Sequence, residues 1–263
     1  GSENTAVGTF ALDANTTANS NSAFGYASLS ANTTGANNTG LGESTLRANT
    51  TGIDNVAVGW SALTANTTGG DNVAVGKQAL IANTTASGNT ALGDRTLQAN
   101  TTGQYNTSVG KDALYNCTTA NNNTAVGVDA SGSITTGGDN ASFGYRALEA
   151  LTTGNSNVAL GPGALRTMTV GDRNTALGYE ALRTANVTSN ADQYNVAAGY
   201  QAGVEVSTGT NNTLIGSRAG HTISSGPHNV CLGSESGRSS VAITTGTGNS
   251  ALHEEYKDRM GLK

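Results

Sequence analysis

The pentapeptide NVAVG occupies residues 55–59 and occurs again unchanged at residues 72–76, seventeen residues further along the chain. The whole unit reads NVAVGWSALTANTTGGD, and related copies place an Asn at fourteen positions, each followed four residues later by a Gly. The step is 17 residues throughout, except for a single step of 21. The chain is therefore a repeat array. The repeated Asn are Asn4, Asn21, Asn38, Asn55, Asn72, Asn89, Asn106, Asn123, Asn140, Asn157, Asn174, Asn195, Asn212 and Asn229.

The length of the unit restricts the architecture. Seventeen residues with two short apolar pieces are too few for a pair of helices, and the unit is too short and too poor in Leu for a leucine-rich repeat. We expect an all-β parallel β-solenoid, or β-roll, in which each unit forms one coil with two short strands. About fourteen coils at a strand spacing of about 4.8 Å would form a column about 67 Å long.

Strand alternation divides the side chains of each coil between two faces. If Val7 points into the coil, Thr5 does too, and Ala6 and Gly8 point outward. The repeated Asn would stack into a ladder whose amides bond to one another and to the turn backbone. Gly at the corner permits a positive φ or a close backbone approach. Small outward side chains suit a close-packed axis between chains, so we expect a homotrimer with the Ala6 and Gly8 positions inside.

The repeats resemble two groups of surface proteins. The motifs that carry the resemblance are NTAVG at 4–8, NVAVG at 55–59 and 72–76, and NTALG at 89–93 and 174–178, each followed by x-x-A-L or x-x-T-L. They are similar to the S-V-A-I-G-x-x-A repeats in the heads of trimeric autotransporter adhesins. The ANTTG segments at 31–35, 48–52 and 65–69 make the chain more similar still to repeat regions of bacteriophage tail fibres.

This resemblance spans Asn4 to about Gly233. It implies a left-handed β-roll, three chains side by side, an extracellular location on a virion tail fibre or a bacterial surface, and attachment to a cell. The adhesin-head repeat is shorter, so the T-T-G segment predicts a larger outer corner in this chain.

The composition excludes several other classes. Charged residues make up 12% of the 263 residues, about half the usual share for a globular enzyme. The 13 basic and 18 acidic side chains leave a net charge of −5, which is too low for a disordered chain and has the wrong sign for nucleic-acid binding. No apolar run approaches the roughly 20 residues of a membrane span, so we expect no membrane insertion in this segment.

The ends of the chain depart from the repeat. We interpret residues 1–2 as a cloning remnant and residues 3–240 as the β-roll. Residues 241–263 then form a degenerate last coil and a charged cap or neck, which a stacked column needs in order to stop end-to-end growth.

Cysteine and histidine give no sign of a site. Cys117 and Cys231 would lie nearly seven coils, or about 30 Å, apart, too far for an intrachain disulfide. Buried or semi-buried free thiols are therefore expected. His221, His228 and His253 lack zinc-ligand spacing, although a threefold axis would turn one His into a ring of three.

The acidic residues do not indicate a catalytic site either. Asp54, Asp71 and Asp139 each precede a repeated Asn, where turn chemistry explains an Asp without any role in catalysis or cation binding. The chain has no Ser-His-Asp order, no G-x-S-x-G and no P-loop, so we expect no enzyme and no cofactor or metal.

The two positions after each Gly are the ones that vary most. Variation within a strict repeat indicates that packing does not dictate these side chains, so we expect them on an exposed corner. Aromatic faces with polar neighbours commonly hold sugars or protein partners, and we predict a ligand-binding lane here. Shielding of the corner between chains is the alternative interpretation. The aromatic residues of the first position are Tyr26, Trp60, Tyr145, Tyr179 and Tyr200.

Paired threonines such as Thr33-Thr34 and Thr50-Thr51 recur in most coils. A ladder of Thr is typical of ice-binding solenoids, but adjacent residues point to opposite faces, which leaves only one outward row.

The sequence favours a non-enzymatic trimeric fibre segment, most simply of a phage tail fibre, that attaches to a host-cell carbohydrate or protein. A bacterial adhesin head, an ice-binding protein and a passive spacer are the alternatives.

Overall fold

The computed structural model describes residues 1–187, 191–237 and 245–252. These ranges contain only three-residue strands, turns and irregular segments, and they hold no helix, so none of them contains a helical membrane span. The chain divides into two compact units, residues 1–136 and 137–263. The charged tail from His253 onward, including the predicted cap, lies outside the described residues.

Each unit is a parallel β-solenoid, which confirms the predicted fold class, with about fourteen coils in the chain. The first unit holds β1 (Thr5–Val7), β2 (Ser22–Phe24), β3 (Thr39–Leu41), β4 (Val56–Val58), β5 (Val73–Val75), β6 (Thr90–Leu92), β7 (Thr107–Val109) and β8 (Thr124–Val126). The second holds β9 (Ala141–Phe143), β10 (Val158–Leu160), β11 (Thr175–Leu177), β12 (Val196–Ala198), β13 (Thr213–Ile215), β14 (Val230–Leu232) and β15 (Ser250–Leu252).

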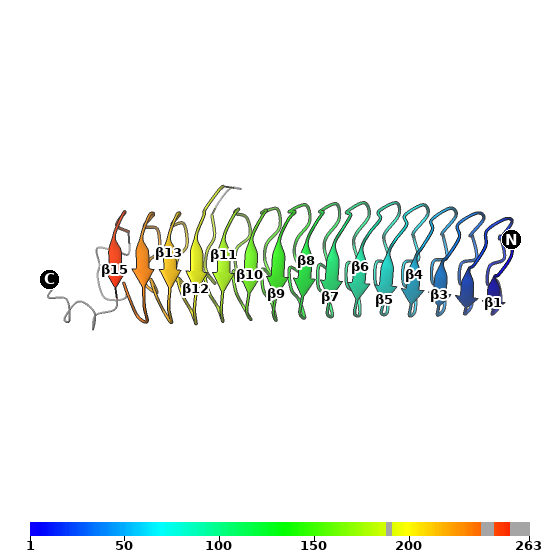
Figure 1. Ribbon diagram of the computed structural model, residues 1–263, viewed down its shortest axis with the longest axis horizontal. Coiled ribbons are helices and arrows are strands. Elements are labelled where there is room, and N and C mark those ends of the chain that lie inside the picture. Colours follow the sequence, from blue (N-terminus) through cyan, green and yellow to red (C-terminus); the bar gives the residue numbers. More distant parts are fainter. Residues whose placement is uncertain (188–190, 238–244, 253–263) are drawn as a thin grey trace. The chain divides into compact units, whose positions relative to one another are not determined.

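Within each unit every strand pairs in parallel with the next strand along the chain (Figure 1), and Val56, for example, lies beside Val73. The 21-residue step keeps this register, because Thr175 of β11 still pairs with Val196 of β12 and the extra residues lie between the two strands. The degenerate last coil also continues the sheet, since Val230 pairs with Ser250 of β15.

Each described coil has one strand, so the expected second strand per coil is wrong. The segment around Leu63 is built of turns, because Ser61 and Leu63 have left-handed φ values of 56° and 54°, which interrupt an extended chain. Bonds between coils continue there nonetheless. The amide of Leu63 donates to the carbonyl of Ala79 at 2.9 Å, and the amide of Thr67 donates to the carbonyl of Thr84 at 2.8 Å.

The predicted assignment of faces is also wrong. Ala57, in the middle of β4, is fully buried, whereas Val56 and Val58 are partly exposed, and the same pattern recurs in the other strands from β2 onward. The reason is the width of the coil. Fully buried Leu63 fills the interior from the opposite wall, so the inward strand position has room only for a small side chain. From β2 onward, the residues equivalent to Ala6 therefore line the core and are not available for an axis between chains.

The glycine after each strand behaves as its sequence position predicts. Gly76 has a φ of +139°, and a Cβ there would lie 2.2 Å from the carbonyl oxygen of Gly93 in the next coil. Both the left-handed backbone and the close approach therefore require glycine.

One pair of coils in the second unit shows how tightly the interior is filled. Gly203 and Gly220 stand where most coils carry the buried Leu, and Leu214 stands where most coils carry Ala. A Cβ on either glycine would lie 2.6 Å from a methyl group of Leu214. The large side chain has moved to the other wall, which keeps the packing close to the density of a protein interior.

The repeated Asn form a buried hydrogen-bonded ladder in each unit, which we call the first ladder. The backbone amide and the Nδ2 group of Asn72 both donate to Oδ1 of Asn55, each at 3.1 Å. Asn72 Nδ2 also donates to the Ala86 carbonyl at 2.9 Å, and its Oδ1 accepts from the backbone amide of Asn89 at 3.0 Å. Each amide thus ties its coil to both neighbours, and buried polar groups are stable only when satisfied in this way.

A second ladder, which the sequence interpretation missed, runs from Asn32 to Asn100 in the first unit through Asn49, Asn66 and Asn83. Asn66 Nδ2 donates to Asn49 Oδ1 at 2.8 Å and to the Gly69 carbonyl at 2.9 Å. The same carbonyl accepts from Asn55 Nδ2 at 2.9 Å. A single backbone oxygen therefore joins the two ladders within a coil.

The second ladder ends at Cys117. The Cys117 thiol is directed at Asn100 Oδ1 at 4.0 Å and at the Ala120 carbonyl at 3.8 Å, as a weak donor would be. Beyond it the same lane is apolar and fully buried, with Ile134, Leu151, Met168, Ala185, Val206 and Ile223. The lane thus changes from an amide ladder to an apolar core on an unchanged backbone.

Candidate functional site

The five aromatic residues predicted to bind a ligand all lie exposed on the corner that follows the strands. This corner lane is the residue directly after each conserved glycine, and its aromatic side chains are 46% to 53% exposed. The coil backbone fixes their positions, because the preceding glycine turns the chain away from the sheet. The lane therefore holds large aromatic surfaces in solvent on a rigid base.

In the first unit the structure does not bring Tyr26 and Trp60 together, because a coil with Glu43 lies between them. Tyr26 packs edge-on against Phe10 of the preceding coil with ring centroids 5.8 Å apart. Trp60 carries Lys77 of the next coil over its ring at 5.7 Å, within the range of a cation–π contact.

In the second unit the aromatic side chains are closer. Tyr179 and Tyr200 occupy successive coils and stack with centroids 5.5 Å apart and planes inclined by 8°. Arg218 lies over Tyr200 at 5.7 Å, and Arg146 lies over Tyr145 at 4.9 Å. The row offers apolar ring faces beside cationic groups.

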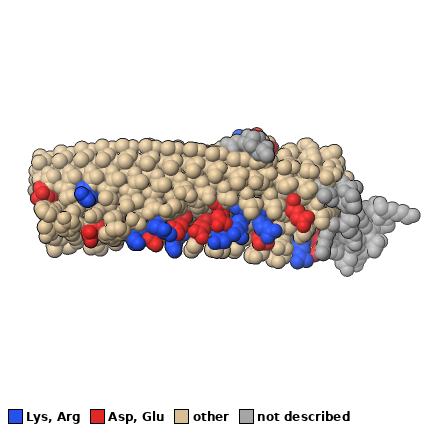
Figure 2. Space-filling model, turned by 180° about the vertical axis from the view of Figure 1, so that it is seen from behind, with Lys and Arg blue, Asp and Glu red and all other residues tan. Residues whose placement is uncertain are grey.

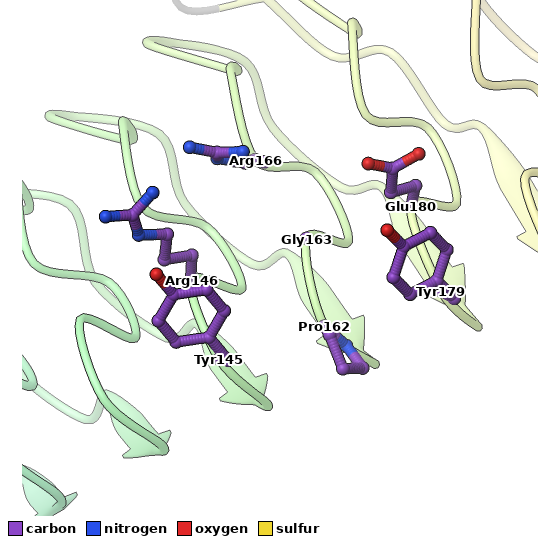
Figure 3. Close-up of a pocket in the computed structure, with 7 residues that line it drawn as sticks. All are labelled: Tyr145, Arg146, Pro162, Gly163, Arg166, Tyr179 and Glu180. Carbon is purple, nitrogen blue, oxygen red and sulfur yellow. The ribbon is translucent and has the colours of Figure 1, made fainter.

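Between Tyr145 and Tyr179 the corner is hollowed. The coil between them carries Pro162, which has a short side chain, and Gly163, which has none, and this leaves a cavity of about 80 Å³. Figure 3 shows Tyr145 and Tyr179 on either side of Pro162, with Arg166 above the hollow. The cavity is too small for an enclosed drug-sized ligand, but it is open and has room for part of a ring.

Ion pairs order the polar rim of this hollow. Glu149 accepts a hydrogen bond from Nε of Arg166 at 2.8 Å and forms an ion pair with Arg146, whose Nε lies 3.3 Å from its carboxylate. The hydrogen bond and charge of Glu149 raise the pKa of Arg166 above its ordinary value. On the other side Glu180 accepts from Arg183 at 3.3 Å. The guanidinium groups are thus positioned beside the aromatic faces.

Charged side chains gather along one edge of the surface in Figure 2, and the rest of that surface is almost uncharged. Several ion pairs connect side chains in or next to the corner lane, such as Arg95 with Asp112 at 2.8 Å in the first unit and Arg218 with Glu235 at 3.5 Å in the second. Charge and aromatic side chains therefore occupy the same corner.

A second exposed surface is the sheet face, formed by the first and third residues of each strand. No strand contains a charged residue, and the third residues are large, apolar and at least one-third exposed in most coils. They are Val7, Phe24, Leu41 and Leu92 in the first unit and Phe143, Leu160, Leu177, Ile215, Leu232 and Leu252 in the second. By strand dimensions the face covers roughly 400 Å² in the first unit, a size typical of interaction sites.

The described Asp and His residues that the sequence analysis did not assign to a site occupy turns. Asp54, Asp71, Asp139 and His228 all have φ values of 57° or 58°, as expected for turn residues that tolerate the left-handed region. Asn37 Nδ2 donates to Asp54 at 3.0 Å. Among the residues that the structure describes, no group of three His, Cys, Asp or Glu is arranged to hold a metal. His253 lies outside them.

The two thiols are free and buried, and desolvation raises the pKa of Cys117 to about 12 and that of Cys231 to about 11. Cys231, in the middle of β14, lines the core with the other inward strand residues. Neither thiol is placed for nucleophilic chemistry.

The threonine pairs divide as alternation predicts. The first Thr bonds along the stack, as when Thr50 Oγ1 donates to the Thr67 carbonyl at 3.0 Å. The second, for example Thr51, is exposed. Only one outward row results, on the turn and not on the sheet.

Comparison of the chain with protein-family models, with curated proteins and with solved structures finds no significant match. The candidate site therefore stands on the geometry alone. The sequence interpretation found its aromatic walls but missed Pro162, Gly163, Arg166 and Glu180. The available signal was a Pro-Gly pair at two positions where the flanking coils carry Tyr with Arg or Glu.

Proposed function

We propose that this chain is a non-enzymatic, extracellular fibre segment that attaches to a cell surface through its corner lane, most simply in a phage tail fibre. The observation that carries the proposal is the contrast within each coil. The Asn of the first ladder and the Gly after each strand from β1 to β14 repeat without change, whereas the exposed corner varies and carries Tyr26, Trp60, Tyr145, Tyr179 and Tyr200. A constant scaffold with a varied aromatic edge is typical of recognition surfaces on solenoids.

The sheet face supports self-association, with a homotrimer as the proposed state. Exposed Phe143 and Leu160 follow one another on successive strands without a charged neighbour in the sheet, and burying such a face releases roughly 25 cal/mol per Å². This assignment replaces the small-residue axis, since the Ala lane lies in the core. Left-handed winding, which the resemblance implies, is part of the same proposal.

The attachment proposal is tested by replacing Trp60 and Tyr145 with Ala and measuring binding to cells and to a glycan array. We expect binding to fall at least fivefold with an unchanged circular dichroism spectrum, because the aromatic surface is lost and the core is untouched. Val128→Ala, an exposed apolar residue of the same lane, is the matched control. Unaltered binding in the double variant would favour a passive spacer.

Self-association is tested by sedimentation of the wild-type chain and of a Phe143→Asp variant. We expect the mass of three chains for the wild type and a smaller mass for the variant, because the charge cannot be buried unpaired. Thr102→Asp, on the exposed threonine row, should leave the mass unchanged. A single-chain mass for the wild type would refute the trimer.

A further inference from the structure

The hollow at Pro162 differs from the rest of the corner because three successive coils combine to form it. Tyr145 and Tyr179 stand in the coils before and after Pro162, about 9.6 Å apart at strand spacing. One ring inserted above Pro162 would lie about 4.8 Å from each tyrosine, which is within stacking distance. The Pro-Gly pair thus opens a gap of one ring thickness in the row.

Two tyrosines form the walls of the gap, and one of them is held in a stacked pair. Tyr200 covers one face of Tyr179 in a nearly parallel stack, so the other face of Tyr179 is directed toward the coil of Pro162. Tyr145 forms the opposite wall, and Figure 3 shows Pro162 between the two rings at the base of the hollow. The apolar surfaces therefore line the sides and floor.

The polar groups lie at the rim. Arg146 and Glu180 follow the two tyrosines in sequence, and Arg166 reaches over the gap. With Arg183 and Glu149, which pair with these groups, the cluster has three cations and two anions. A flat ring with apolar C–H faces, hydroxyl groups at its edge and a negative charge fits this arrangement.

We propose that this hollow binds one pyranose unit that carries a carboxylate, as part of an acidic surface polysaccharide. The sugar ring stacks between Tyr145 and Tyr179 over Pro162, and Arg166 receives the carboxylate. The proposal deepens the attachment function and rests on it, since it names the chemical class that the corner lane recognises.

The test uses titration calorimetry of the full chain with uronic-acid oligosaccharides, oligogalacturonate and oligoguluronate, and with neutral maltohexaose. We expect an acidic oligosaccharide to bind at least tenfold more tightly than the neutral one. Pro162→Tyr should lower that affinity at least tenfold, because a third tyrosine fills the gap while both walls stay in place. The substitution copies the flanking coils, and Thr102→Tyr, on the exposed threonine row outside the corner lane, is the control with unchanged affinity.

Arg166→Gln separates charge from shape, and we expect it to lower the affinity for the acidic oligosaccharide at least fivefold with little effect on the neutral one. Absence of binding to any uronic-acid probe, or unchanged binding by Pro162→Tyr, overturns the proposal. If the wild type still binds cells in that case, the attachment function stands and only the sugar site fails. If it binds neither cells nor sugars, both fail.

Discussion

The lane of the second ladder is polar in one region of the molecule and apolar in another. From Asn32 to Asn100 it is a row of hydrogen-bonded amides, and at Leu151, Val206 and Ile223 it is a row of buried hydrocarbon side chains. The first ladder is present in both regions, and the Gly209 carbonyl still accepts from Asn195 Nδ2 at 2.8 Å. The first ladder is therefore kept in both regions because its amides connect successive coils. The second lane can be either polar or apolar, provided that the residues of neighbouring coils match.

The largest effect is expected from the ladder that both regions share. Asn72→Ala removes the acceptor of the Asn89 amide and the bonds to Asn55 and Ala86. At about 1–3 kcal/mol for each buried group left unpaired, we expect a loss of about 4 kcal/mol in the free energy of unfolding, measured by denaturant titration. The exposed Asn116→Ala should change it by less than about 0.5 kcal/mol. Equal losses in the two variants would contradict the ladder's role.

The next effect concerns the apolar region. Leu214→Ala should lower the free energy of unfolding by about 3 kcal/mol, because it empties space that Gly203 and Gly220 cannot fill. Adding Gly203→Leu should restore part of the loss, since it returns these coils to the arrangement of the others. Thermal or denaturant unfolding of the wild type, the single variant and the double variant measures this. A further loss of stability in the double variant would show that a large residue on one wall of the coil does not compensate for a small one on the other.

A reciprocal exchange between the two regions tests the comparison itself. Asn66→Val leaves Asn49 Oδ1 without its donor, and Val206→Asn places an amide between Ala185 and Ile223, where Oδ1 has no donor. We expect each to lower the free energy of unfolding by about 2 kcal/mol. If Asn66→Val changed the free energy of unfolding no more than a substitution at an exposed position, the second ladder would contribute nothing to stability.

The smallest effect is expected at the end of the second ladder. Burial raises the pKa of Cys117 from 9.0 to about 12 in the folded protein, so between these pH values the unfolded state binds fewer protons and stability falls as pH rises. Relative to Cys117→Ser, the wild type should lose about 1.4 kcal/mol between pH 7 and pH 10. Denaturant midpoints at the two pH values measure the difference. A pH dependence identical in both proteins would contradict a buried thiol.

The sequence predicted the stacking because its 17-residue step survives every substitution, and it predicted the glycine backbone for the same reason. Its assignment of the inward face was wrong. Alternation separates Ala57 from Val56 and Val58 but is blind to direction, and only the width left by Leu63 decides it. The second ladder was not predicted. Its replacement by Cys117, Ile134 and later apolar residues was the sign that the lane is buried.

Part of the candidate site was also predictable from the repeat. Exposure of Tyr145 and Tyr179 follows from variation within a strict repeat, which needs no coordinates. The hollow depends on which short residues stand between the tyrosines in space, and on how Arg166, four residues beyond Pro162, folds back over the gap. Such a combination becomes visible only when the coils are stacked.

The most direct test of the account is the position of the Asn side chains relative to one another. In a protein with ¹⁵N-labelled Asn, NMR should show slowly exchanging Nδ2 amide protons for Asn55, Asn72 and Asn89, with nuclear Overhauser contacts between residues 17 apart. Rapid exchange of these protons with solvent and no contacts at that spacing would contradict the stacked coils and, with them, the corner that they hold in place.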